Sequence, residues 1–368
     1  MYDNNRAFRL RRRPEGDVAP GDLELVIEPV APLEDGQALV RTLMLSLDPT
    51  LRLWMSDIRG YMPPVPIDDV MRGLGVGQVV ESRRDDLPVG AIVSGWTGWQ
   101  ELCVADDAQL EAPFAVLPDP LPAPMSAFLG ALGHTGITAY VGIDLGGVKA
   151  GETVVVSAAA GAVGEVAGQL AKARGARVVG IAGGPEKARH VVEDLGFDAC
   201  VDHRAEDWRE QLDAATPDGV DVDFENVGGA IMDHVLMRLN IGARIALCGM
   251  ISQYNHSGGD DVWAGQVNIG QLIMQRATMV GFLVLDHADR FEEAIEVLAG
   301  MVAEGTLRYD ETLMDGGLER MPEALTALFD GANTGKLVLR LGEPEDYAAS
   351  DRAGSTSRAS RSAIRSSS

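Results

Sequence analysis

The sequence predicts an α/β protein with two domains, one rich in β-strands and one built on a doubly wound parallel sheet. At 368 residues, of which 46% are apolar, the chain exceeds one ordinary domain and can bury a sizeable core. Residues 1–127 carry short apolar runs interrupted by prolines and glycines, which is typical of irregular β structure. From residue 128 to 288, β-branched runs alternate with segments of helical apolar spacing. This alternation indicates right-handed crossovers and a parallel sheet that is covered on both faces.

The individual elements follow from these patterns in chain order. In the β-rich part we expect strands at Ala38–Leu45, Gly75–Val80 and Ala91–Val93. In the alternating part we expect strands at Thr153–Ser157, Arg177–Ile181, Ala199–Val201, Val220–Phe224, Arg244–Cys248 and Met279–Leu285. Apolar spacing predicts helices at Val163–Ala173, Glu186–Leu195 and Arg290–Glu304, and a β-like segment follows at Lys336–Leu341. Residues 343–368 lack apolar periodicity and are predicted to be a disordered tail.

The charge of the chain excludes several classes of partner. Asp and Glu outnumber Lys and Arg by 55 to 31, and the formal net charge of −24 repels phosphate backbones and anionic lipid head groups. We therefore expect neither nucleic acid nor a membrane as a partner, and no apolar run reaches the ~18 residues of a membrane span. Three widely separated cysteines and an N-terminus without a signal-like apolar segment favour a cytoplasmic protein.

Lysine is rare in this chain, because arginine supplies 27 of the 31 basic residues. A very acidic, lysine-poor surface is typical of proteins from organisms with molar intracellular salt, where the Debye length falls to ~3 Å. High genomic G+C content also replaces lysine by arginine. The composition is therefore compatible with a halophilic protein and equally with a bias in base composition.

A small-residue turn after the strand Thr153–Ser157 carries the strongest local motif. The segment 154–164 reads as strand, turn and helix start, with Ala159, Gly161 and Gly164 at the three glycine positions of a dinucleotide fingerprint. Gly161 allows a pyrophosphate to approach the backbone, and Gly164 allows the helix and strand to pack closely. The N–H groups at the start of the helix would bind the phosphates. The alternative is a tight strand-to-helix turn without a ligand.

The end of the next strand indicates which dinucleotide is bound. An NAD site places Asp or Glu about 20 residues after the motif, where it binds the ribose 2′-hydroxyl. Here the strand Arg177–Ile181 is followed by Ala-Gly-Gly, and the nearest side chains, Lys187 and Arg189, are cationic. A cation can bind a 2′-phosphate, so the sequence favours NADPH as the cofactor. The alternative is a surface helix start with ordinary solvated charges.

Ordered motifs along almost the whole chain carry a family resemblance. They are Asn5-Arg6, Arg13–Gly16, Leu45–Pro49, Gly98–Glu101, Gly136–Tyr140, Gly183–Lys187, Phe224–Gly229 and Cys248–Asn255. From about Asn5 to Leu341 the chain resembles the zinc-independent medium-chain dehydrogenase/reductases of the prostaglandin reductase, leukotriene B4 12-hydroxydehydrogenase and plant double-bond reductase type. This resemblance implies a GroES-like catalytic domain at 1–127, a Rossmann NADP-binding domain at 128–288, and a return to the catalytic domain at 289–342. It places the active site between the two domains and implies a homodimer.

The resemblance also places functions on particular residues. The residues expected to contact NADPH are Gly161, Ala162, Val163, Gly164, Lys187, His203, Asn226, Cys248, Gly249, Met250, Ile251, Ser252, Gln253, Tyr254, Phe282, Leu283, Val284 and Asn333. Taken without the resemblance, Asn226 and Asn333 are turn formers beside glycines. In the same way Phe282 is a core residue, and Tyr254 is a packed aromatic residue of a loop.

The chain departs from the family pattern at two positions, and it lacks a metal-binding pattern. Thr50 stands where relatives often have Tyr, so an aromatic wall of the substrate pocket is expected to be missing, and His203 stands where they often have Tyr beside the adenosine. A zinc-dependent relative needs Cys, His and Glu ligands, but the corresponding stretch Gly73–Gly77 has none, and the six histidines are scattered. We therefore expect no metal.

These observations predict an NADPH-dependent reductase of the carbon–carbon double bond in α,β-unsaturated ketones and aldehydes, with a small-molecule enone or enal as substrate. Tyr254 is the expected hydrogen-bond donor or proton source, because a phenol with a pKa of ~10 stays protonated at pH 7, and the cofactor ribose hydroxyl is expected to share this role. The alternatives are a quinone reductase of the same superfamily and a non-enzymatic NADPH-binding protein.

Overall fold

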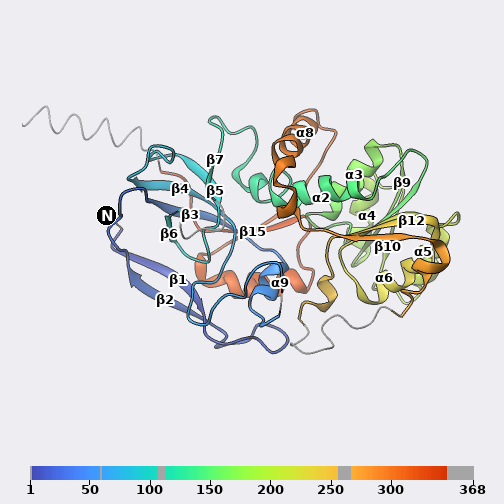
Figure 1. The fold of residues 1–368 in the computed structure, drawn as a ribbon, viewed down its shortest axis with the longest axis horizontal. Coiled ribbons are helices and arrows are strands. Elements are labelled where there is room, and N and C mark those ends of the chain that lie inside the picture. The colour runs from blue at the N-terminus through green and yellow to red at the C-terminus, as the bar shows by residue number, and fades with distance from the viewer. Residues whose placement is uncertain (1, 59, 107–112, 256–266, 346–368) are drawn as a thin grey trace, which may run out of the picture.

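The computed structural model describes residues 2–58, 60–106, 113–255 and 267–345, and it contains two domains that lie side by side (Figure 1). Strands from the first third of the chain build the domain drawn in blue and cyan, and the middle of the chain builds the domain drawn in green and yellow. Within these ranges no helix has the length and apolar character needed to cross a bilayer. The predicted two-domain α/β fold is confirmed.

The second domain contains a six-stranded sheet in which every strand pair is parallel. Its strands are β8 (Thr153–Ser157), β9 (Arg177–Ala182), β10 (Ala199–Asp202), β11 (Val220–Glu225), β12 (Leu239–Leu247) and β13 (Thr278–Gly281), in the order β10-β9-β8-β11-β12-β13. The chain leaves β8 toward one edge and returns to β11 beside it, so the strand order reverses between β8 and β11. Ligands of doubly wound sheets bind at the carboxyl ends of the strands at such a switch point.

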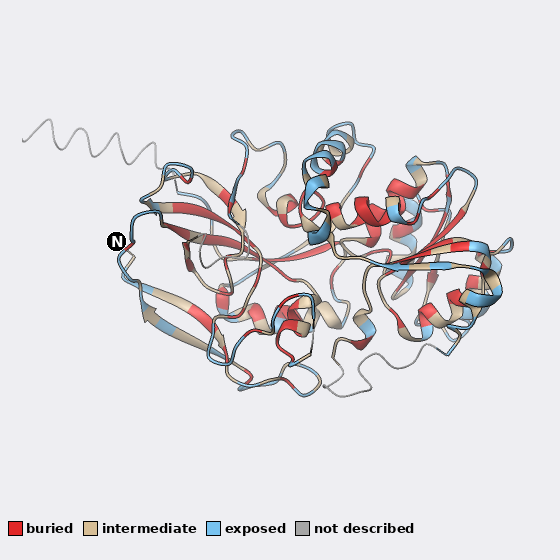
Figure 2. Ribbon diagram, viewed as in Figure 1, coloured by how far each residue is buried: buried red, intermediate tan, exposed pale blue. Residues whose placement is uncertain are grey.

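Helices cover both faces of this sheet, and the central strands between them are buried (Figure 2). On one face the helices are α2 (His134–Leu145), α3 (Gly164–Ala173), α4 (Pro185–Glu193) and α8 (Phe291–Ala303). The opposite face is covered by α5 (Trp208–Ala215) and α6 (Gly229–Leu236), and α7 (Gln271–Gln275) lies against β12. All five residues of β8 are buried, as expected for a β-branched strand in the middle of a doubly covered sheet.

The first domain contains a mixed sheet to which the end of the chain contributes. Its strands are β3 (Ala38–Ser46), β4 (Gly75–Ser82), β5 (Ile92–Gly95), β6 (Leu102–Ala105), β7 (Ala115–Val116), β14 (Glu311–Asp315) and β15 (Lys336–Arg340). A hairpin of β1 (Asn4–Leu10) and β2 (Leu23–Pro29) lies beside this sheet, and the short helices α1 (Thr50–Trp54) and α9 (Met321–Phe329) pack in the same domain. Because β15 pairs with β3, the chain returns to the first domain after completing the parallel sheet.

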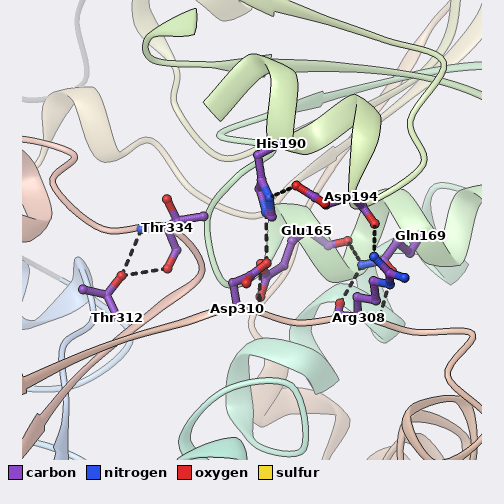
Figure 3. A network of polar contacts seen from close by, with 8 residues as sticks. All are labelled: Glu165, Gln169, His190, Asp194, Arg308, Asp310, Thr312 and Thr334. Carbon is purple, nitrogen blue, oxygen red and sulfur yellow. Dashed lines mark hydrogen bonds and ion pairs between the residues drawn. The ribbon is translucent and has the colours of Figure 1, made fainter. Parts of the chain in front are cut away.

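A polar network holds the returning segment against the second domain (Figure 3). The backbone N–H of Asp310 donates to both carboxyl oxygens of Glu165 at 3.3 Å, and Gln169 exchanges two hydrogen bonds of 2.8 and 2.9 Å with the backbone of Arg308. His190 Nε2 lies 2.9 Å from Asp310 Oδ2. The segment 308–310 is therefore fixed to α3 and α4 before it enters β14.

Most of the expected strands and helices agree with the structure to within two residues, with three differences. The strand expected at Arg244–Cys248 is β12, which begins five residues earlier at Leu239. The strand expected at Met279–Leu285 ends at Gly281, because its last partner in β12 is Leu247, and a 3₁₀ helix follows at Val284–Arg290. At the start of the expected disordered tail, Gln78 exchanges two hydrogen bonds with the backbone of Glu345. Residues 343–345 therefore dock on the first domain, and the rest of the expected tail lies outside the described residues.

Candidate active site

A cavity of about 520 Å³ lies between the two domains, at the carboxyl ends of β8 and β11. Fifteen of the predicted site residues line this cavity: Gly161, Ala162, Val163, Gly164, Lys187, His203, Asn226, Cys248, Gly249, Ile251, Ser252, Tyr254, Leu283, Val284 and Asn333. The other wall comes from the first domain and includes Thr50, Trp54, Tyr61 and Trp96. The cavity is therefore a cleft that requires both domains.

The backbone of the turn between β8 and α3 is so closely packed that its conformation is sterically restricted. Ala158 has a positive φ of 51°, and a Cβ atom on Gly164 would lie 2.3 Å from the Ala158 carbonyl oxygen. The first turn of α3 therefore packs directly on the end of β8 and presents its N–H groups at the cavity. Gly335 of the returning segment donates its N–H to Ala160 at 2.8 Å, which fixes the other side of the turn. This close-packed turn fits the pyrophosphate of a dinucleotide.

Two cations, Lys187 in the first turn of α4 and Arg204 just after β10, meet at one end of the cavity. Lys187 Nζ donates to the carbonyl oxygen of Gly331 at 2.9 Å, and Arg204 donates to the carbonyl oxygen of Asp330 at 3.2 Å. Burial, and to a lesser degree Arg204, lowers the pKa of Lys187, as expected where two cations share a site before an anion enters. Together with His203 they fit a 2′-phosphate.

Sequence reasoning named Arg189 in this place and missed Arg204. Arg189 is exposed on α4 and does not line the cavity, whereas Arg204 does. Arg204 could have been predicted from its position directly after His203, because the resemblance placed His203 beside the adenosine. A carboxylate also lies nearby at the end of β10, because Asp202 accepts the backbone N–H groups of Gly184 and Arg204 at 2.7 and 2.9 Å. These bonds turn the carboxylate toward the backbone, and it does not line the cavity.

Asn226 follows β11 and is hydrogen-bonded to Ser157 at the end of the neighbouring strand β8. Its side-chain amide donates to the Ser157 carbonyl oxygen, and its backbone N–H donates to the Ser157 hydroxyl, both at 2.7 Å. The Ser157 hydroxyl donates in turn to Glu225 at 2.9 Å. Burial raises the pKa of Glu225, while the backbone N–H groups of Gly228 and Val227 oppose that rise. Asn226 is therefore both a turn residue and a wall of the cavity at the switch point.

Tyr254 lies at the end of a loop that follows β12. Hydrogen bonds join this loop to the residues directly after β11. The N–H groups of Ile251 and Ser252 donate to the carbonyl oxygens of Asn226 and Val227 at 3.1 and 3.0 Å. The phenol oxygen of Tyr254 accepts the Met250 N–H at 3.1 Å. Burial raises the pKa of Tyr254 to about 12, so the phenol is protonated at neutral pH. The loop therefore presents a neutral hydrogen-bond donor at the cavity.

Three residues of the predicted set do not line the cavity. Met250 packs against the backbone at Gly228, and Gln253 is buried. Phe282 packs with Phe224 against Gly142 of α2 and belongs to the core, as the alternative interpretation held. Consecutive residues of a loop point in different directions. A prediction that takes every residue of a contiguous motif therefore overestimates the number that line the cavity.

Three aromatic side chains of the first domain and His134 of α2 form a wall that the sequence did not reveal. Tyr61, Trp54, Trp96 and His134 follow one another at centroid distances of 6.2, 5.7 and 6.4 Å, and all four line the cavity. The expectation that Thr50 leaves this wall without an aromatic group is therefore wrong. Tyr61, eleven residues further along the chain, places its phenol oxygen 2.5 Å from Thr50 Oγ1.

A buried ion pair holds the loop that carries Thr50. Lys336, one of the four lysines of the chain, is 2% exposed, and its ammonium lies 3.1 Å from Asp48 Oδ1 and donates to the carbonyl oxygen of Leu47. Ser46 donates to the other carboxyl oxygen of Asp48 at 2.5 Å. Since Lys336 begins β15, the returning segment fixes the first-domain side of the cavity.

Across the described ranges no three His, Cys, Asp or Glu side chains are grouped as a metal ion would require. Cys103, Cys200 and Cys248 are free, and burial raises the pKa of each thiol to about 12. These thiols are therefore protonated at neutral pH and do not act as thiolate nucleophiles there.

Known proteins share both the sequence and this arrangement. A family model described as the N-terminal domain of oxidoreductase matches residues 6–112, and one described as zinc-binding dehydrogenase matches residues 162–300. The chain is 42% identical over 343 residues to the NADPH-dependent curcumin reductase of Escherichia coli, covering 92% of this chain and 97% of that protein. It is 37% identical over 342 residues to the NADP(+)-dependent 2-alkenal reductase of Nicotiana tabacum, covering 91% and 97%.

A solved structure agrees over nearly the whole fold. The crystal structure of CurA from Vibrio vulnificus in complex with NADPH is 40% identical, covers 92% of this chain and 100% of its own, and superimposes with a TM-score of 0.85. Identity at this level along almost the full length of both chains shows common descent as well as a common fold. The chain therefore belongs to the zinc-independent medium-chain dehydrogenase/reductases, among the NADP-dependent oxidoreductases of the alkenal, curcumin and prostaglandin reductase group.

Proposed function

We propose that this protein uses NADPH to reduce the carbon–carbon double bond of α,β-unsaturated ketones and aldehydes. The observation that carries the proposal is the position of Tyr254, a neutral phenol that lines the same cleft as the dinucleotide-binding turn and the aromatic wall. Relatives named as a curcumin reductase and a 2-alkenal reductase support the same substrate class.

The cofactor NADPH fits the second-domain side of the cleft. The turn from Ala158 to Gly164 would hold the pyrophosphate, and Lys187 with Arg204 would hold the 2′-phosphate. Asn226 and the loop that ends at Tyr254 would border the ribose and nicotinamide. When bound, NADPH supplies a hydride for the β-carbon of the substrate.

The residues of the chain would stabilise the charge that this reduction creates. Negative charge develops on the carbonyl oxygen of the substrate as an enolate, and a positioned donor in a closed site stabilises it. The Tyr254 phenol would donate a hydrogen bond to this oxygen and then its proton, which gives the enol. The enol becomes the saturated carbonyl compound when the α-carbon takes up a proton from water and the enol oxygen releases one, and the phenolate regains its proton from water. The phenol oxygen of Tyr254 accepts the Met250 N–H at 3.1 Å, which restrains the position of the phenol in the cleft.

The first domain would orient the substrate. Trp54, Trp96 and Tyr61 offer flat apolar faces and edges to a conjugated group, which favours a planar enone over a saturated ketone. Holding the β-carbon close to the hydride donor lowers the barrier by positioning alone.

A spectrophotometric assay with identification of the product tests the proposal. NADPH absorbance should fall with enones and enals, and the product should be the saturated carbonyl compound rather than the allylic alcohol. Formation of the alcohol, or no consumption of NADPH with any member of a panel of aliphatic and aryl enones, would reject the proposed reaction.

We also propose a homodimer formed through the edge of the parallel sheet. Among the described strands β13 pairs only with β12, so its outer edge presents backbone N–H and C=O groups to a second strand. Ile273 and Met274 on the adjacent α7 are 77% and 66% exposed, which favours burial against a second copy. Light scattering coupled to gel filtration should give twice the chain mass, and Val280→Pro in β13 should give the monomer mass.

A further inference from the structure

Asn255, the residue directly after Tyr254, makes a hydrogen bond to the first domain. Its side-chain amide nitrogen donates to Oδ1 of Asp17, in the connection between β1 and β2, at 2.6 Å. Because a carboxylate only accepts hydrogen bonds, the amide must turn its nitrogen toward Asp17. The two backbones also meet here, since a Cβ atom on Gly16 would lie 3.9 Å from the Asn255 carbonyl oxygen. The loop that carries Tyr254 therefore leaves the second domain after β12 and contacts the first domain one residue beyond the phenol.

A buried arginine holds the connection between β1 and β2 in place. Arg52 of α1 is fully buried, and its guanidinium donates to the carbonyl oxygen of Gly16 at 2.8 and 2.9 Å and to that of Pro14 at 3.1 Å. Burial lowers the pKa of Arg52, and the charges of Asp22 and Asp17 oppose that decrease. A buried cation destabilises a protein unless hydrogen bonds and negative charge compensate it. The connection that carries Asp17 is therefore fixed to α1.

Helix α1 also carries part of the substrate side of the cleft. Thr50 and Trp54 line the cavity, and Arg52 lies between them in the same helix. A chain of contacts therefore runs from this helix through the β1–β2 connection to the loop that ends at Tyr254. The hydrogen bonds of that loop to the residues after β11 hold it against the second domain. Asn255 adds a contact to the domain that would hold the substrate.

We propose that Asp17 and Asn255 are positioning residues that fix the distance between the Tyr254 phenol and the substrate side of the cleft. This inference rests on the proposed function, and it adds two residues that act through Tyr254 rather than on the substrate. The phenol belongs to one domain and the aromatic wall to the other, and a displacement of about 1 Å between reacting groups lowers a rate strongly. A hydrogen bond between the domains, at the residue next to the phenol, restricts this displacement.

Single-turnover kinetics with an enone test the contact. Asp17→Ala and Asn255→Ala should each lower the rate about fivefold, the size expected for the loss of one hydrogen bond, and leave the Kd for NADPH unchanged. The double variant should lose no more than either single variant, because both changes remove the same bond. Asp17→Asn should stay within about twofold of the wild type, since its amide oxygen still accepts from Asn255. Glu15→Ala removes an exposed carboxylate two residues earlier and is the matched control, with an unchanged rate.

Three results would overturn the proposal. One is an unchanged rate in Asp17→Ala and Asn255→Ala, and another is a double variant in which the two losses multiply. The third is an equal loss in Asp17→Asn and Asp17→Ala, because the charge near Arg52, and not the hydrogen bond to Asn255, would then control the rate.

Hydrogen exchange of the loop gives a second readout that needs no turnover. The N–H of Met250 donates to the Tyr254 phenol, and the N–H groups of the next two residues donate to the turn after β11. These amides should exchange about fivefold faster in Asp17→Ala and in Asn255→Ala than in the wild type. Faster exchange in both variants supports the positioning contact even if no enone is reduced, a result that would reject only the proposed reaction. Exchange at the wild-type rate in both variants rejects the positioning role, even where turnover occurs.

Discussion

The two sides of the cleft are built in different ways. On the cofactor side, backbone geometry does most of the positioning: Gly164 sits against the Ala158 carbonyl, and Asn226 joins the ends of β8 and β11. On the substrate side, side chains from separate segments do the positioning, because Tyr61 is hydrogen-bonded to Thr50 and Lys336 is paired with Asp48. The cofactor side depends on short contiguous motifs, whereas the substrate side depends on contacts between segments distant in sequence. A relative can therefore keep the cofactor while its substrate range changes.

The comparison of the two sides of the cleft predicts that a substitution of Tyr254, which lies where the two sides meet, causes the largest loss of turnover. Tyr254→Phe should lower kcat on enones by about 10- to 1000-fold, the range for one positioned donor, and leave the Kd for NADPH nearly unchanged. Stopped-flow kinetics and fluorescence titration measure the two quantities. An unchanged kcat would mean that another group delivers the proton and that the catalytic assignment is wrong.

The second largest effect is expected at the two cations of the cofactor side. Lys187→Ala and Arg204→Ala should each raise the Kd for NADPH about tenfold, and the double variant about 100-fold, because each removes a charge-assisted bond to phosphate. The Kd for NADH, which lacks that phosphate, should stay constant. Arg189→Ala is the matched control, since Arg189 is an exposed cation on the same helix as Lys187 and does not line the cavity. Equal losses for NADH and NADPH would show that these cations stabilise the fold rather than the phosphate.

Backbone geometry on the cofactor side is tested by adding one methyl group. Gly164→Ala places a Cβ 2.3 Å from the Ala158 carbonyl oxygen, so the turn must open, at a cost of about 1–3 kcal/mol in the free energy of unfolding. Gly300→Ala on α8 adds the same methyl group where nothing lies within 4 Å and should not destabilise the protein. Urea unfolding of both variants provides the measurement. A Gly164→Ala protein as stable as the wild type would contradict the close packing of this turn.

The smallest effect concerns Glu165 in the network that joins the two sides (Figure 3). Burial raises the pKa of Glu165 well above the ordinary 4.5; the Asp310 N–H opposes this rise, and the charges of Asp310 and Glu311 add to it. The folded protein therefore binds a proton that the unfolded chain releases. Stability from this group is therefore complete below pH 4.5 and is lost as the pH rises toward the folded pKa.

Replacing the carboxyl group removes this dependence on pH. The melting temperature of Glu165→Gln should exceed that of the wild type by about 2–4 °C at pH 8, the shift that 1 kcal/mol produces in a domain of this size. At pH 5 the difference should be smaller. Calorimetry at both pH values measures it, and a difference that grows toward low pH would contradict the assigned direction of the pKa shift.

The same contrast explains how much the sequence revealed. The strand β8 and the helix α3 could be placed almost to the residue, because a β-branched run and a glycine turn fix local structure by themselves. Lys187 could be predicted to lie at the cavity because it follows its strand closely. Tyr61 could not be found, since its role comes from a contact with Thr50 across a loop that no local pattern predicts. Phe282 packs against the core and does not line the cavity, and the sequence could not decide this, because an aromatic residue after a strand can face either the core or the cleft.

Transfer of a labelled hydride tests the central claim most directly. The protein is incubated with NADPH carrying deuterium on the transferable position of the nicotinamide, together with an aryl enone, and the product is analysed by NMR and mass spectrometry. A cleft that holds the β-carbon at the nicotinamide, with Tyr254 at the carbonyl oxygen, predicts a saturated ketone with one deuterium on the β-carbon. Deuterium on the carbonyl carbon of an alcohol product, or unlabelled product, would contradict this account.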